Sequence, residues 1–149
     1  MSDHRLETFF QDYARYHRHP GNKLCHYLGI PLIIFTLVGL GAKIQLGGID
    51  LAVILTLPVF LYHATLSPKL AAIFGLFLVA CYPLAPMLSN TALWAGFVLG
   101  WVFQFFGHYG FEKNSPAFFK NLQQLLVGPL WVVNDLLQLI RPTTAPRGA

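Results

Sequence analysis

The sequence predicts an all-α fold, a multi-pass membrane helical bundle of about four spans that forms one domain over residues 1–149. Its composition is the first reason, because 55% of the residues are apolar and only 11% are charged, whereas a soluble domain has roughly a quarter charged. The second reason is a series of apolar segments, each near the ~20 residues that cross a bilayer. So few charges cannot cover a water-facing surface, so we expect an integral membrane protein.

The region 1–26 is expected to hold an amphipathic helix on the cytoplasmic side, followed by a turn at a metal site. Leu6, Tyr13 and His17 fall on one stripe of a helix over 3–18. A Pro-Gly dipeptide then breaks the helix. His17 continues the apolar stripe, so its side chain is predicted to point inward.

Four apolar segments follow, separated by turn-forming residues, and they are expected to span the membrane at 27–46, 49–65, 70–88 and 91–111. The region 112–140 is read as a loop and a further helix. Its apolar run, 122–140, is interrupted by a Gly-Pro dipeptide at 128–129, so we expect a re-entrant or interfacial helix instead of a fifth span. The tail 141–149 is polar and Pro-rich, and we expect it to be disordered.

Basic residues predict the orientation of the spans. With four spans, nine of the ten Lys and Arg residues fall on one side, and only Lys43 on the other. The positive-inside rule then places both termini in the cytoplasm, at a bacterial inner membrane or, in a eukaryote, at the endoplasmic reticulum. The basic residues lie scattered in loops, so no nucleic-acid partner is expected.

The end of the fourth segment carries the candidate chemistry. Gln104, His108 and Glu112 are spaced four apart, which places them on one face of an α-helix. Ionisable groups at this depth are expensive and are functional candidates by default. The topology places them at the same membrane face as His17 and His26. Imidazoles with a carboxylate suit iron or zinc.

A structural explanation is also open for each of these residues. Glu112 can form an ion pair with one of three nearby basic residues, Arg15, Arg18 or Lys23. A lone histidine is more often a satisfied interfacial side chain than a metal ligand. On the same apolar segment, Gly96 and Gly100 form a G-x-x-x-G pattern, which predicts close approach of a neighbouring helix.

Two stretches of the sequence resemble the signatures of a known family. The first is H-R-H-P-G-N-K-L-C-H-Y-L-G-I-P-L at 17–32. The second is Q-F-F-G-H-Y-G-F-E at 104–112, followed by S-P-A-F at 115–118 and L-L-V-G-P-L-W at 125–131. Together they resemble the family of the 2-hydroxy fatty acid dioxygenase of phytosphingosine degradation, a family of small multi-pass membrane proteins.

The resemblance implies an Fe(II)-dependent dioxygenase that uses O2 to shorten a 2-hydroxy fatty acid by one carbon in an α-oxidation. Carried over by motif, the metal ligands are His17, His26 and His108. Glu112 is implied as a fourth ligand or as a partner of the ligands, and Asn22 and Gln104 as supporting polar groups in catalysis.

Two other functions stay open at this point. The first is a non-enzymatic membrane scaffold or lipid-binding protein, in which the histidines and Glu112 form an interfacial hydrogen-bond network. The second is a zinc-dependent membrane hydrolase, which needs a general base beyond its metal ligands. Glu112 is the evident candidate for that base. Bound iron distinguishes the dioxygenase from both.

Overall fold

The computed structural model describes residues 2–140, and nearly all of them are helical. The expected all-α class is therefore confirmed, with one short β-hairpin added. In chain order the elements are α1 Ser2–Arg15, α2 Pro20–Gly41, β1 Gln45–Leu46, β2 Ile49–Asp50, α3 Leu51–Leu66, α4 Pro68–Leu84, η1 Ala85–Met87, α5 Asn90–Phe106, η2 Gly107–Glu112, η3 Ala117–Phe119 and α6 Gln123–Ile140.

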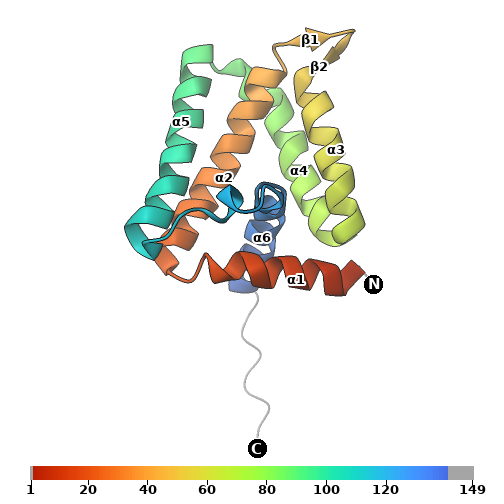
Figure 1. Cartoon of the computed structure of the whole chain (residues 1–149). Helices are drawn as coiled ribbons and strands as arrows, with labels where there is room; N and C mark the ends of the chain where they lie inside the picture. Colours follow the sequence, from red (N-terminus) through yellow and green to blue (C-terminus); the bar gives the residue numbers. More distant parts are fainter. Residues whose placement is uncertain (1, 141–149) are drawn as a thin grey trace, which may run out of the picture.

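The helices form two pairs with a shared closed end (Figure 1). Helix α2 packs along α5, and α3 packs along α4. Helix α1 lies across the lower end of both pairs, and α6 lies behind it, in contact with α1, α2 and α4. The β-hairpin is at the opposite end (Figure 1). This arrangement leaves a space between the two helix pairs that the lower helices close.

Helix α2 begins earlier than the sequence indicates. The ring of His19 caps it by accepting a hydrogen bond from the N–H of Gly21 at 3.0 Å, and Pro20 occupies the first turn, where its missing N–H costs nothing. Residues 2–26 therefore contain a helix, a short turn and the first residues of α2. Helix α1 ends at Arg15, the turn is short, and His26 lies inside α2.

The first apolar segment also ends before residue 46. Helix α2 stops at Gly41, and the chain then forms the β1–β2 hairpin through Gly47 and Gly48, whose φ angles are 61° and 86°. Two consecutive positive φ angles are typical of the two-residue turns that join antiparallel strands. The predicted span 27–46 is thus shorter at this end, and the hairpin connects α2 to α3.

The predicted close approach at Gly96 and Gly100 is confirmed. A Cβ on Gly96 would lie 2.9 Å from the Thr36 methyl group, and a Cβ on Gly100 would lie 2.6 Å from Ile33 and 3.1 Å from the carbonyl oxygen of Gly29. Small residues let the α2 and α5 backbones meet. This contact aligns α2, which carries His26, with α5, which leads directly into the turn η2 that carries His108.

The end of the fourth segment is not a continuous α-helix. Helix α5 ends at Phe106, and residues 107–112 form the π-helical turn η2. The helix that leads from Gln104 through His108 to Glu112 is therefore π-helical and not α-helical over its last turn, and Gln104 and His108 are both buried. At its start, Gly107 packs against Asn22 and Cys25 of α2 so closely that a Cβ has no space.

Helix α6 is continuous over Gln123–Ile140, with Pro129 inside it. The expected interruption at residues 128–129 is absent: the helix continues through Pro129, which removes one backbone hydrogen bond from its interior. The carboxylate of Asp135, further along, accepts from Lys23 at 3.1 Å. The tail 141–149, expected to be disordered, lies outside the described residues.

Two described helices are long and apolar enough to cross a membrane, Pro20–Gly41 and Pro68–Met87. Only 39% and 28% of their most apolar stretches are buried inside the fold. The core helix of a soluble protein is mostly buried, so these helices present far more apolar surface than such a core does.

Candidate metal centre

Three histidines from distant parts of the chain meet at the closed end of the bundle. His17 follows α1, His26 lies in α2, and His108 lies in η2. One potential ligand nitrogen from each ring lies within 4.8 Å of the others. The three residues are 1–2% exposed. Metal sites need several ligand atoms within this range, and the spacing is the first sign of such a site.

Two of the rings are held in a defined tautomer. Nδ1 of His17 lies 2.7 Å from the carbonyl oxygen of Tyr13, and Nδ1 of His26 lies 2.9 Å from the carbonyl oxygen of Asn22. A carbonyl oxygen only accepts hydrogen bonds, so each Nδ1 carries the proton. In a neutral imidazole the other nitrogen, Nε2, then holds a lone pair.

These two lone pairs face each other. The Nε2 atoms of His17 and His26 are 2.9 Å apart, and neither carries a hydrogen to donate. Two acceptors this close repel unless a cation lies beside them. Two ligand nitrogens at roughly 2.1 Å from one ion, at right angles, stand roughly 3 Å apart. The tautomers and the spacing therefore fit a metal ion, with the Nδ1–H to carbonyl bonds that metal-bound histidines make.

The third ring has an unmatched nitrogen as well. Nδ1 of His108 is buried and has no hydrogen-bond partner within residues 2–140. Its ring centroid lies 4.8 Å from that of His17 and 4.9 Å from that of His26. An unpaired buried polar atom costs about 1–3 kcal/mol, so an unpaired nitrogen on the third ring of this cluster supports a ligand at the site.

Burial keeps the imidazoles neutral. Burial, with the charge of His26 nearby, lowers the pKa of His17 to about 2. Neutral imidazole is the form that binds metals, so the rings are ready to act as ligands near neutral pH.

Two aromatic residues complete the cluster. The ring of Tyr13 stacks on His17 with centroids 4.0 Å apart and an interplanar angle of 2°, and Trp131 lies 5.3 Å from the same histidine. Sequence analysis placed Tyr13 on the apolar face but assigned it no role at the site. It did not single out Trp131, whose position beside His17 depends on how α6 packs.

Glu112 lies next to the cluster but outside the three-histidine group. Its Oε1 accepts the backbone N–H of His19 at 2.6 Å and the side-chain amide of Asn22 at 3.3 Å. Burial raises the pKa of Glu112, but these hydrogen bonds lower it by a larger amount, so the net shift is downward. The carboxylate thus stabilises the N-terminal end of α2, where a negative charge is favoured.

Asn22 connects this carboxylate to a ligand. It is fully buried, its amide also donates to the carbonyl of Tyr16 at 3.0 Å, and its backbone carbonyl accepts from His26. Gln104 is buried on α5, where its amide donates weakly to the carbonyl of Cys25 at 3.5 Å. The structure therefore gathers all the candidate residues in one region, with three of them facing one another directly.

The alternative ion pairs of Glu112 are not what the structure contains. Lys23 pairs with Asp135 of α6 at 3.1 Å, where Asp135 also accepts from the hydroxyl of Tyr27. The ammonium of Lys23 lies 5.3 Å from the ring of Trp131. These contacts join α2 to α6 and hold Trp131 over the histidines.

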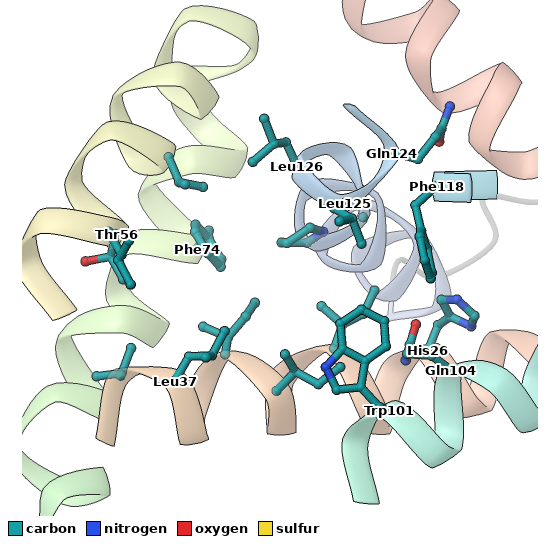
Figure 2. A pocket seen from close by; sticks show the side chains of 18 of the residues that line it. His26, Leu37, Thr56, Phe74, Trp101, Gln104, Phe118, Gln124, Leu125 and Leu126 are labelled. Atoms are coloured by element: carbon teal, nitrogen blue, oxygen red, sulfur yellow. The ribbon is translucent and has the colours of Figure 1, made fainter. Parts of the chain in front are cut away.

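An apolar cavity of about 390 Å³ extends from the histidines between the two helix pairs. His26 and Gln104 lie at one end, with Trp101 beside them, and Thr56 and Phe74 lie at the other (Figure 2). The volume is in the range of small-molecule sites, ~300–1,000 Å³. No Lys, Arg, Asp or Glu of the described chain lines it, so its polar groups are concentrated at the histidine end.

Comparison with known proteins agrees with this geometry. The model of the Mpo1-like family, described as 2-hydroxy-palmitic acid dioxygenase Mpo1-like, matches residues 4–140. The 2-hydroxy-palmitic acid dioxygenase MPO1 of Saccharomyces cerevisiae is 28% identical over 139 residues, which cover 84% of this chain and 75% of the yeast protein. No solved structure shows significant similarity to this chain.

Proposed function

The chain belongs to the Mpo1-like family, and from this premise we propose that it is an Fe(II)-dependent dioxygenase of 2-hydroxy fatty acids. The observation that carries the proposal is the meeting of His17, His26 and His108 at the polar end of a long apolar cavity. A fatty acid with a polar head and an apolar tail matches that division.

The cavity orients the substrate. Its walls from Ile30 to Val38 of α2 are apolar, and each buried methylene group contributes about 0.8 kcal/mol. The head must therefore lie at the histidine end, since no cation of the described residues elsewhere in the cavity can neutralise a carboxylate. Gln104, buried beside His26, is placed to hydrogen-bond the head group.

Bound Fe(II) would supply O2 activation and chelation of the substrate's carboxylate and hydroxyl groups. The three histidines would hold the metal through their unprotonated nitrogens, and Tyr13 and Trp131, which pack against His17, exclude water from that side of the site. The overall reaction balances with O2 alone: the 2-hydroxy acid and O2 give the acid one carbon shorter, CO2 and water. No further reductant is needed.

Glu112 and Asn22 act as positioning residues in this proposal. Glu112 holds Asn22 and the start of α2, and the carbonyl of Asn22 holds the Nδ1–H of His26. Such outer partners fix the orientation and raise the basicity of a ligand, and their loss typically lowers metal affinity or activity about 10- to 100-fold.

We further propose that the chain crosses a membrane several times within one domain. The support is the low burial of its apolar helices and the gathering of Arg5, Arg15, Lys69 and Lys113 at the end where the histidines lie. By the positive-inside rule that end and both termini face the cytoplasm. Reporters fused to the C-terminus test this: a periplasmic or lumenal reporter that becomes active would contradict it.

The two other candidate functions are less well supported. A scaffold does not explain why the Nε2 atoms of His17 and His26 lie 2.9 Å apart while both Nδ1 atoms donate to carbonyl oxygens. A three-histidine set also suits catalytic zinc, but a zinc hydrolase needs a free general base. Glu112, the candidate for that base, is occupied by His19 and Asn22.

The deciding experiment combines metal analysis and turnover. Protein purified without air in detergent is expected to contain iron near one ion per chain and to convert 2-hydroxy-palmitic acid to the acid one carbon shorter, with consumption of O2. Reconstitution with Zn(II) should give no such product. Zinc-supported hydrolysis, or full turnover after complete removal of metal, would contradict the proposal.

A further inference from the structure

The far end of the cavity lies against a second apolar space that opens outward. This groove, about 380 Å³, runs between α3 and α4. Its lining includes the small residues Ala72 and Gly75 and the exposed side chains of Leu57, Leu76 and Val79. Gly75 is required there, because a Cβ would lie 2.8 Å from the ring of Phe60.

Two residues belong to the lining of both spaces, Thr56 of α3 and Leu78 of α4. The inner cavity and the outer groove are therefore separated by these side chains. Neither lining contains a charged residue. The hydroxyl of Thr56 donates to the carbonyl of Ala52 at 2.7 Å, within its own helix, so it presents no unpaired polar group to a passing hydrocarbon chain.

The length of the inner cavity indicates a role for the boundary that it shares with the groove. Its α2 wall runs from His26 to Val38, which is roughly 18 Å at 1.5 Å per residue. An extended hydrocarbon chain with C–C bonds of about 1.5 Å advances roughly 1.3 Å per carbon. The cavity thus holds about fourteen carbons, so a longer chain must fold back or leave the cavity, and the groove between α3 and α4 is the apolar space that adjoins its far end.

We propose that the cavity and the groove form one acyl-chain tunnel, with Thr56 and Leu78 as its constriction. The occupant of the groove is the distal part of the substrate's own chain, which reaches the outer side of α3 and α4. The inference rests on the proposed function, because it takes the fatty acid's head to be at the histidines. It predicts that the tunnel does not set an upper limit to chain length.

Photolabelling of the wild-type protein in detergent tests the tunnel. We use 2-hydroxy-palmitic acid and its tetracosanoic homologue, each with a diazirine at the last carbon, and map the labelled peptides by mass spectrometry. The shorter probe should label the inner wall near Ala52 and Phe74, and the longer probe should label Leu57 or Leu76 of the groove. Excess unlabelled 2-hydroxy acid should abolish both labels.

Labelling of the inner wall by both probes would overturn the tunnel, because it means that long chains fold back. Groove labelling that resists the unlabelled competitor would overturn it too, because the groove then binds lipid independently of the site. The readout is binding, so it is separate from turnover. A protein that labels as expected but oxidises neither acid keeps the tunnel and loses the proposed reaction.

A constriction variant provides a second measurement. Thr56→Phe should lower groove labelling and the kcat/KM for the longer acid, relative to the shorter acid, by at least about 10-fold, the scale at which apolar pockets discriminate chain length. Leu61→Phe is the matched control, since Leu61 is exposed on the same helix and lines neither space. An unchanged ratio in folded Thr56→Phe protein would contradict the assignment of the constriction.

Discussion

The two ends of the bundle pair their polar side chains in different ways. At the hairpin end, Asp50 caps α3 by accepting from the N–H of Val53 at 2.9 Å and also accepts from the hydroxyl of Tyr82. Lys43 donates to the carbonyl of Leu88 at 2.6 Å and to Asn90 at 2.9 Å. These groups satisfy one another, and they join the helix ends.

Toward the histidine end, by contrast, several buried polar atoms of the described residues have no hydrogen-bond partner. Within the described residues, the buried side-chain atoms that have no partner are Asn22 Oδ1, His63 Nδ1, His108 Nδ1 and Gln124 Oε1. None of them is at the hairpin end. Asn22 and His108 belong to the site and Gln124 lines the cavity, whereas His63 bonds to the carbonyl of Leu126 in α6 through its other nitrogen. Unmatched polar atoms cost stability and are kept where a ligand or a reaction uses them.

The largest effect is expected from a substitution in the histidine cluster itself. His108→Ala removes one of the three proposed ligands. Iron binding and turnover of 2-hydroxy-palmitic acid should therefore fall by more than about 100-fold, which is the upper end of the loss expected when only a hydrogen-bond partner of a ligand is removed. Iron per chain in anaerobically purified protein measures it. His4→Ala, at an exposed position of α1, is the control and should retain both. Iron retained by folded His108→Ala protein would contradict the site.

A smaller effect is expected when a positioning residue is changed at the same end. Glu112→Gln keeps an acceptor oxygen for His19 and Asn22 but removes the charge, so iron affinity or kcat should fall about 10- to 100-fold. Titration with Fe(II) and rate measurements on the same preparation separate the two. Glu7→Gln, exposed on α1, is the matched control. Loss of iron as complete as in His108→Ala would make Glu112 a ligand instead.

A substitution in the contact between α2 and α5, which connects the two ends, should change the stability of the fold. Gly100→Leu places a side chain where Ile33 and the carbonyl of Gly29 already lie, and such overpacking costs about 1–3 kcal/mol. Thermal unfolding in detergent should show a lower Tm. Ala95→Leu, at an exposed position of the same helix, controls for residue size. Equal Tm values for the two variants would mean that the contact between α2 and α5 tolerates a large side chain at position 100.

The smallest effect is expected at the hairpin end, and it depends on pH. The hydroxyl of Tyr82 and the N–H of Val53 hold the pKa of Asp50 below its usual value. A lowered folded-state pKa stabilises the fold above the unfolded pKa, and this contribution is lost as pH falls through the folded pKa. Asp50→Asn should lower Tm near neutral pH and flatten this acid dependence, with iron content unchanged. A change in iron content would show that the two ends are coupled.

The sequence by itself determined the helical class and pointed to the three histidines that the structure brings together. Low charge and repeated apolar segments predict helices that bury little of their surface, and the inward stripe of α1 predicts the burial of His17. The G-x-x-x-G pattern predicts the contact of α5 with another helix, which the structure identifies as α2. These features follow from local spacing, because the period of a helix relates neighbouring residues directly.

Only the tertiary structure decided how those residues are used. The Nε2 atoms of His17 and His26 face each other because carbonyls of Tyr13 and Asn22 fix their tautomers, and tautomers are not written in residue types. Packing of η2 against the start of α2 also joins the carboxylate of Glu112 to His19 and Asn22. The cavity and its α3–α4 constriction depend on packing between helices far apart in the chain. Their geometry is non-local, so no periodicity in the sequence could predict it.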